Sequence, residues 1–285
     1  MKAKPSQITD QSQDRNPGVE YKMDPQPEVI RAGYRGSGKL EGKNTIITGG
    51  DSGIGRSVAV HFAREGANVA IVYLNEDKDA EDTKKMVEAE GVRCLLFAGD
   101  QSKSSFCDYV VKEVVDTFGS LDVLVNNAAW QEQTQDITKI TDEKWRKTQA
   151  VNSDGYFFFA RAATPHLKKS KGNVINTSSV NAFMGMGSLL DYSTSKGANL
   201  AFSRSLADVL VEDGVRVNTV APGPIWTPFI PGGMDDTSGF GKNTPMGRAG
   251  QPSELGPAYV FLACDDASYI TKQTIHINGG MTTGG

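Results

Sequence analysis

The strongest candidate for chemistry is a tyrosine and a lysine that open a predicted helix over 192–212, in the stretch Tyr192-Ser193-Thr194-Ser195-Lys196. Positions i and i+4 share one face of a helix, so Tyr192 and Lys196 can approach one ligand together. A nearby ammonium favours the phenolate, and we expect it to lower the pKa of Tyr192 toward neutrality. Tyr192 would then act as a general acid or base. The pattern is common by itself, so its meaning depends on its surroundings.

Two further polar residues precede this pair. Ser179 follows a strand predicted at 173–177, and Asn152 falls inside the helix predicted at 142–167 before that strand. Ligands of parallel α/β sheets bind beyond the carboxyl ends of the strands. Ser179 is therefore expected at such a site, with Tyr192 and Lys196 beside it.

A glycine-rich turn supplies a second kind of site. The predicted strand at 44–48 runs into Gly49-Gly50-Asp51-Ser52-Gly53-Ile54-Gly55, and a helix follows. Glycines permit a tight turn and let the backbone approach a pyrophosphate, and the N-terminus of the helix offers free N–H groups. The spacing G-x-x-x-G-x-G differs from G-x-G-x-x-G, but the physical logic is the same. A purely structural turn is the alternative, and its place after the first strand favours a dinucleotide.

The end of the second strand, predicted at 68–74, bears on which dinucleotide binds. In NAD-preferring proteins an acidic residue there holds the adenosine ribose. Leu74 occupies that position, with Tyr73 before it and Asn75 after it. The absence of an acid permits NADP, yet no Arg or Lys stands there to attract its 2′-phosphate. NADP and NAD both stay open, and the sequence favours NADP.

Strands and helices alternate along the rest of the chain. Further strands are predicted at 93–98, 121–126, 215–220 and 273–277, and further helices at 57–65, 80–90, 106–118 and 253–264. Such alternation is typical of βαβ units in one parallel sheet. The predicted fold class is α/β, a single Rossmann-type doubly wound domain with a seven-stranded parallel sheet flanked by helices.

The first forty residues differ from the rest. They hold four of the 12 prolines and no Phe, Trp or Cys, and they follow neither helical nor strand periodicity. Such a segment cannot bury a core of its own. It is either disordered or laid across its own or a neighbouring subunit, and Tyr21, Met23, Val29, Ile30 and Tyr34 favour the second. We therefore predict an extended arm over 1–40 and one domain over 41–285.

Composition excludes several functions. Lys+Arg is 30 and Asp+Glu is 34 among 285 residues, a net charge of −4 without a basic block, so neither nucleic acid nor an anionic membrane is an expected partner. No apolar run is long enough to span a membrane, and the N-terminus lacks a secretory signal. The three cysteines form no CxxC pair, which favours reduced thiols in the cytoplasm. The three histidines lack ligand spacing, so no metal is expected.

The motifs as a set resemble one family. The turn at 48–55, Asn126-Asn127-Ala128-Ala129, Ser179, the Tyr192/Lys196 pair and Pro222-Gly223 occur in the order and spacing of the short-chain dehydrogenase/reductase family. The resemblance covers roughly residues 40–282. The long polar arm resembles the branch related to glucose and ribitol dehydrogenases and general-stress reductases.

The resemblance implies a role for each matching residue. Tyr192 would be the catalytic acid/base, and Lys196 would lower its pKa and bind the nicotinamide ribose. Ser179 would orient the substrate oxygen, and Asn152 would support a proton-relay water. Cofactor contacts are expected at Gly49, Asp51, Ser52, Gly53, Ile54, Gly55, Tyr73, Asn75, Asp100, Gln101, Asn127, Tyr192, Lys196, Pro222, Gly223, Ile225 and Thr227.

The function implied is an NAD(P)-dependent oxidoreductase. It would move hydride between the cofactor and the carbonyl or alcohol carbon of a small aldehyde, ketone or sugar, as a cytoplasmic homotetramer. Enoyl reduction is a second possibility, but that branch usually places its Tyr and Lys farther apart. A catalytically silent dinucleotide-sensing protein is the alternative of another class, although an intact set of four catalytic residues argues against it.

Three features depart from or extend the family pattern. Ala129 stands where a glycine is usual, so the backbone there must suit a side chain. Lys272 also replaces a glycine, and a positive φ there would strain the turn. Residues 228–245 lie where the family carries a substrate lid, and their Gly, Asp and Thr content predicts flexibility.

Overall fold

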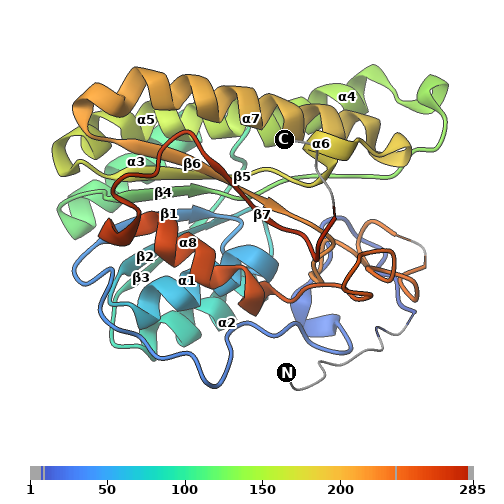
Figure 1. Ribbon diagram of the computed structural model, residues 1–285, viewed down its shortest axis with the longest axis horizontal. Helices are drawn as coiled ribbons and strands as arrows, with labels where there is room; N and C mark the ends of the chain where they lie inside the picture. The colour runs from blue at the N-terminus through green and yellow to red at the C-terminus, as the bar shows by residue number, and fades with distance from the viewer. Residues whose placement is uncertain (1–7, 9, 235, 282–285) are drawn as a thin grey trace.

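The computed structural model describes residues 8, 10–234 and 236–281, and within them one sheet organises the chain (Figure 1). Its seven strands are all parallel, in the order β3-β2-β1-β4-β5-β6-β7. The strands are β1 (Asn44–Thr48), β2 (Asn68–Tyr73), β3 (Cys94–Ala98), β4 (Val123–Asn126), β5 (Asn173–Thr177), β6 (Arg216–Pro222) and β7 (Thr274–Ile277). The predicted seven-stranded parallel sheet is confirmed.

Helices cover both faces of the sheet, and each face buries its own apolar cluster. One cluster joins β1 and β2 to α1 and α8, and the other lies under α3, α5 and α7. The helices are α1 (Gly53–Arg64), α2 (Asp77–Glu88), α3 (Ser104–Phe118), α4 (Asp142–Gln149), α5 (Gly155–Ser170), α6 (Asn181–Met184), α7 (Leu190–Leu210) and α8 (Gly256–Ala263). Because both faces are covered, the central strands are apolar on both sides. None of the described helices is long and apolar enough to cross a membrane.

The order of the strands reverses between β1 and β4. The chain moves outward from β1 to β2 and β3, then returns to place β4 on the other side of β1. A crevice opens at such a switch point, beyond the carboxyl ends of the strands. The glycine-rich turn after β1 and the turn after β4 therefore face each other there.

The helix predicted at 142–167 is interrupted. It consists of α4, a π-helical turn over Ala150–Asp154 and α5. A π-helical turn accommodates one extra residue and is frequent at functional sites. Asn152 lies in this turn and is fully buried.

The two family departures have clear backbone consequences. Ala129 is not among the described non-glycine residues with positive φ, so its backbone suits a side chain. Lys272 has a φ of 64°, so the expected strain of a side chain in the left-handed conformation is present at this turn. Its ammonium pairs with Asp208 on α7, at 2.6 Å, which ties this turn to the helix.

The N-terminal segment lies against its own chain. A 3₁₀ turn over Glu20–Lys22 is anchored by Glu20, whose carboxylate accepts the N–H of Gly53 at 2.6 Å and pairs with Arg56 at 2.6 Å. Asp79 of α2 in turn accepts the N–H of Glu20 at 2.7 Å and pairs with Arg56. Two acids from different segments thus share one buried guanidinium. The division at residue 40 stays a prediction.

The segment after β6 also packs on this arm. Met23 joins Trp226, Ile230 and Ala249 in a small apolar cluster, and the indole of Trp226 donates to the carbonyl of Pro25 at 2.8 Å. The backbone N–H of Gln13 donates to the carbonyl of Pro231 at 2.8 Å. The predicted lid is therefore packed against the arm in this structure, and its flexibility stays a prediction.

Candidate active site

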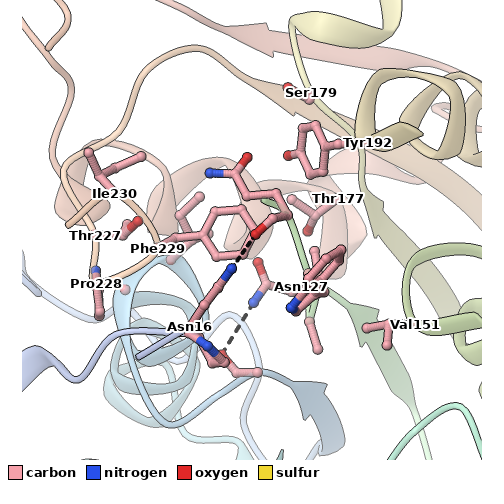
Figure 2. Close-up of a pocket in the computed structure, with 18 of the residues that line it drawn as sticks. Asn16, Asn127, Val151, Thr177, Ser179, Tyr192, Thr227, Pro228, Phe229 and Ile230 are labelled. Carbon is pink, nitrogen blue, oxygen red and sulfur yellow. Dashed lines mark hydrogen bonds between the residues drawn. The ribbon is translucent and has the colours of Figure 1, made fainter. Parts of the chain in front are cut away.

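A cavity of about 1070 Å³ lies at the switch point, between the glycine-rich turn, the turns after β4 and β5 and the segment after β6. Figure 2 shows Ser179 and Tyr192 on one side of it, Asn16 and Asn127 on the other and Phe229 between them. Most predicted site residues line this cavity. They are Gly49, Asp51, Ser52, Gly53, Ile54, Tyr73, Asp100, Gln101, Asn127, Ser179, Tyr192, Lys196, Pro222, Gly223, Ile225 and Thr227.

Ser179 and Tyr192 form the centre of the polar side. Ser179 follows β5 and Tyr192 lies in the first turn of α7, and the Ser179 hydroxyl is near enough to lower the pKa of Tyr192. Both side chains are largely buried, with 7% and 8% of their surface exposed. A carbonyl oxygen placed against both hydroxyls would receive two hydrogen bonds, which is the arrangement that stabilises a developing alkoxide.

The ammonium of Lys196 lies below this pair. It donates to the carbonyl of Thr177 at 2.8 Å and to the hydroxyl of Tyr156 at 3.3 Å, and it lies 5.6 Å from the centre of the Tyr192 ring. Burial lowers the pKa of Lys196 to about 7. Lys196 is therefore poised to gain or lose a proton near neutral pH.

The expected lowering of the Tyr192 pKa is wrong. Burial raises the pKa of Tyr192 to about 12, and the hydrogen bond from Ser179 offsets only part of this increase. The ammonium does not lower it, because its hydrogen bonds run to Thr177 and Tyr156 and because Lys196 itself is only partly charged. Tyr192 is thus a proton donor at neutral pH and not a phenolate.

Asn152 has a different role from the residues that line the cavity. Its amide donates to the carbonyl of Trp130 at 2.9 Å and accepts the N–H of Trp130 at 2.7 Å. The same amide donates to Ser195 at 3.0 Å. Asn152 does not line the cavity, and it locks the turn after β4 to α7 beside Tyr192.

The glycine-rich turn has the shape that a close ligand requires. Gly49 and Gly53 have φ angles of 63° and 53°. A Cβ on Gly55 would lie 1.8 Å from the carbonyl oxygen of Gly49, so Gly55 permits the helix to approach the turn and does not itself line the cavity. The amide of Asn127 donates to the carbonyls of Thr48 and Gly49 and holds the turn against β4.

The other predicted contacts surround this turn. Asp100 accepts the N–H of Ser102 at 2.9 Å, and the amide of Gln101 donates to Val151 at 2.8 Å while its buried oxygen lacks a partner in the described residues. Pro222, Gly223, Ile225 and Thr227 form the wall at the end of β6. A dinucleotide fits this lining for two reasons. The glycines of the turn leave room for a ligand close to the backbone, and the side-chain oxygen of Gln101 is an acceptor without a partner in the described residues.

Several lining residues were not predicted. Glu76, which follows Asn75, lines the cavity and is almost fully buried, whereas Asn75 does not line it and instead accepts from Arg15. Asn16, Pro17 and Gly18 of the arm also line it. The acid at 76 could have been found from its place near the end of the second strand, but no local signal indicates that the arm reaches the cavity.

The comparisons with known proteins agree with this geometry. Residues 49–282 match the family model described as enoyl-(acyl carrier protein) reductase. The uncharacterized oxidoreductase YhxC of Bacillus subtilis is 52% identical, over 96% of each chain. The chain belongs to the short-chain dehydrogenase/reductase family. It is therefore an oxidoreductase that uses NAD(P), and the predicted family is confirmed.

Other members of the family show how broad it is. General stress protein 39 of Bacillus subtilis is 49% identical, over 97% of each chain, and NADPH-dependent aldehyde reductase 1 of Arabidopsis thaliana is 46% identical, over 95% of this chain and 96% of that one. A short-chain dehydrogenase from Burkholderia cenocepacia solved with NADP has a TM-score of 0.80 at 27% identity, over 85% of this chain and 98% of that one. A 3-ketoacyl-(acyl-carrier-protein) reductase from Brucella melitensis solved with NADH has a TM-score of 0.78 at 31% identity, over 85% of this chain and 98% of that one.

Proposed function

We propose that this enzyme reduces the carbonyl group of a small aldehyde, ketone or sugar, with Tyr192 as the general acid. The observation that carries the proposal is that Ser179 and Tyr192 line the large cavity together, with the ammonium of Lys196 5.6 Å from the centre of the Tyr192 ring. The bound cofactor would supply hydride to the carbonyl carbon. The enzyme would use the same residues in reverse to oxidise an alcohol.

The proton path follows from the positions of the Tyr192 and Ser179 hydroxyls in the lining of the cavity. Tyr192 gives its proton to the substrate oxygen as charge develops there, and Ser179 donates a hydrogen bond to the same oxygen. A pKa of about 12 suits Tyr192 for holding this proton until the oxygen becomes basic. Lys196, whose pKa is about 7, can supply a positive charge below the ring as Tyr192 becomes a phenolate.

The cofactor contacts remain part of the proposal. The turn over residues 49–55 would bind the pyrophosphate through backbone N–H groups other than those of Gly49, Gly50 and Gly53, which are bonded to Val72 and Glu20. Asp100 and Asn127 would border the adenosine. Lys196 would bind the nicotinamide ribose, and Ile225 and Thr227 would border the nicotinamide. We favour NADP(H), a choice supported by the relative named as an NADPH-dependent aldehyde reductase.

Assembly and location belong to the same proposal. We infer a homotetramer, because helices α3, α4 and α5 leave large apolar side chains exposed, at Tyr109, Trp145 and Phe157. Exposed apolar surface of this kind favours association. We also infer a cytoplasmic enzyme, since its three cysteines are free and buried.

A screen of NADPH and NADH oxidation with small aldehydes, ketones and sugars tests the function. We expect turnover with at least one carbonyl compound, and its loss in Tyr192→Phe and Ser179→Ala. An enoyl thioester belongs in the same panel, because the matching family model carries that description. Exclusive turnover of the enoyl compound would replace carbonyl reduction with enoyl reduction. Tight cofactor binding without any turnover would indicate a dinucleotide sensor.

A further inference from the structure

Arg15 of the N-terminal arm lies where the second strand ends. Its Nη2 donates to Oδ1 of Asn75 at 2.9 Å and pairs with the carboxylate of Glu76. The side chain of Glu76 is 4% exposed and lines the cavity, whereas that of Arg15 is 40% exposed. Residues that follow the second strand of such a sheet border the adenosine ribose. The arm thus brings a guanidinium against Glu76 at the ribose end of the cofactor site, although Arg15 itself does not line the cavity.

The arm holds Arg15 in a defined position. Nε of Arg15 donates to the carbonyl of Pro17 at 3.1 Å, and the amide of Asn16 donates to the carbonyl of Gln131 across the cavity. The buried contacts of Glu20 with Gly53 and Arg56 fix the chain on the other side. The guanidinium therefore lies between two fixed points of the backbone.

Part of this guanidinium is unused. Nε and Nη2 have the partners named above, and Nη1 has none within the part of the chain that the structure describes. An arginine carries five N–H donors in a planar fork that matches the oxygens of a phosphate. Arg15 can therefore bind a second anion through Nη1, or release Glu76 and bind another anion in its place.

The other residues near the end of the second strand do not offer a cation of this kind to a ligand in the cavity. Asp51 of the glycine-rich turn and Glu76 both line this end of the cavity, and burial together with the charge of Glu76 raises the pKa of Asp51 to about 7. Ser52 stands in the same turn without a charge. Arg56, the other nearby guanidinium, is buried and held by Glu20 and Asp79. Without Arg15, a 2′-phosphate would meet only acids and neutral groups from the glycine-rich turn and the end of β2.

We propose that Arg15 is the residue that recognises the 2′-phosphate of NADP(H), while Glu76 recognises the 2′-hydroxyl of NAD(H). With NADP(H) the guanidinium turns from Glu76 to the phosphate, and with NAD(H) it stays on Glu76, whose carboxylate accepts from the ribose. The arm is then part of the cofactor site and sets which cofactor binds. This inference rests on the nicotinamide cofactor of the proposed function and not on its substrate.

The test uses nucleotide fragments, so that turnover is not required. Calorimetry measures the binding of 2′,5′-ADP and 5′-AMP to the full-length protein, and NADPH and NADH fluorescence gives the same comparison for the whole cofactors. Arg15→Ala should weaken 2′,5′-ADP and NADPH by about 10–100-fold, the range of charge-assisted hydrogen bonds, and leave 5′-AMP unchanged. Arg31→Ala is the matched control, because Arg31 is an exposed arm residue paired with Glu254. It should change neither ligand.

A second variant tests the opposite preference. Glu76→Gln should weaken NADH by several-fold and leave NADPH binding equal or tighter, because the acid that competes for Arg15 is gone. Melting temperatures identify any variant that fails to fold. An equal effect of Arg15→Ala on both ligands, no effect at all, or a wild-type protein that binds none of the four nucleotides would overturn the proposal. Failure of every carbonyl substrate would overturn the proposed function but leave this binding result intact.

Discussion

Tyr192 and Lys196 show how burial changes the chemistry of a familiar residue pair. Both side chains are nearly inaccessible, and burial alone disfavours the charged form of each. At neutral pH the site therefore holds a neutral tyrosine and a partly neutral lysine. A ligand that brings charge or displaces water will change the pKa values of both groups together. The two groups are therefore expected to titrate as a coupled pair.

Replacing Tyr192 by Phe tests the proton donor directly. The change removes the hydroxyl and keeps the ring, so cofactor binding should survive while kcat falls by about 10²–10⁴-fold, the usual contribution of a general acid. Steady-state kinetics together with NADPH fluorescence titration separates the two effects. Near-normal turnover in the variant would exclude Tyr192 from the mechanism.

Replacing Lys196 by Met should stabilise the fold while it impairs catalysis. The folded pKa of about 7 lies below the ordinary 10.5, so between these values the unfolded chain binds a proton that the folded chain does not, and this group destabilises the fold increasingly as the pH falls toward 7. At pH 7 the free energy of unfolding of the variant should exceed that of the wild type by about 2 kcal/mol. This is what remains of the penalty for the shifted lysine pKa after the loss of the two hydrogen bonds of Lys196 is subtracted.

Urea unfolding of both proteins across pH 7–10.5 measures this effect. The gain should shrink as the pH rises, because the unfolded lysine then loses its proton too. Lys168→Met is a suitable control, since Lys168 is an exposed residue of α5. A difference between wild type and variant that is constant with pH would show that the buried lysine is not the cause.

Among the elements, the 3₁₀ turn of the arm and the first turn of α1 support each other. Glu20 accepts an N–H at the start of α1, and Asp79 accepts an N–H at the start of the 3₁₀ turn. Arg56 pairs with both acids inside the protein. The start of the helix that is proposed to bind the pyrophosphate is therefore held by the arm.

Glu20→Ala should release the arm. It leaves the N–H of Gly53 and one side of Arg56 without their partner, so we expect a loss of about 2–4 kcal/mol and rapid proteolysis near the N-terminus. Limited proteolysis and urea unfolding measure this, with Lys22→Ala as an exposed control on the same turn. Equal protease resistance of Glu20→Ala and wild type would contradict the anchoring role.

The sequence predicts what local signals encode. Alternating apolar runs and glycine punctuation give all seven strands, and the motif spacing brings Ser179, Tyr192 and Lys196 together. The π-helical turn around Asn152 was not predicted, because its periodicity differs from that of an α-helix by only one residue. The contacts of Arg15 and Asn16 could not be predicted either, since they join positions about sixty or more residues apart that share no pattern.

At the scale of the whole molecule, α3, α4 and α5 each leave a large aromatic side chain exposed, at Tyr109, Trp145 and Phe157. Phe157 is 45% exposed in α5, and Arg161 one turn later stacks against it. A helix face of this kind is expected to bury itself against a second copy. Tyr192 and Lys196 lie on α7, which covers the same face of the sheet as α3 and α5.

Phe157→Glu tests the assembly. A charge in the centre of this face should lower the mass of the particle, measured by light scattering, from a tetramer to a dimer or monomer. Ile137→Glu places the same charge on another exposed apolar residue and should leave the mass unchanged. A wild-type monomer, or an unchanged mass in Phe157→Glu, would contradict the proposed interface.

The buried triad of Glu20, Arg56 and Asp79 is expected to couple substitutions at these three positions. Its members belong to the arm, to α1 and to α2; both acids lose their ion pair when Arg56 is replaced, and Arg56 loses one of its two when either acid is replaced. The three positions are therefore expected to change together or not at all among descendants of this gene. A chimera that receives a foreign arm would need the matching arginine and aspartate from the same donor before that arm could dock.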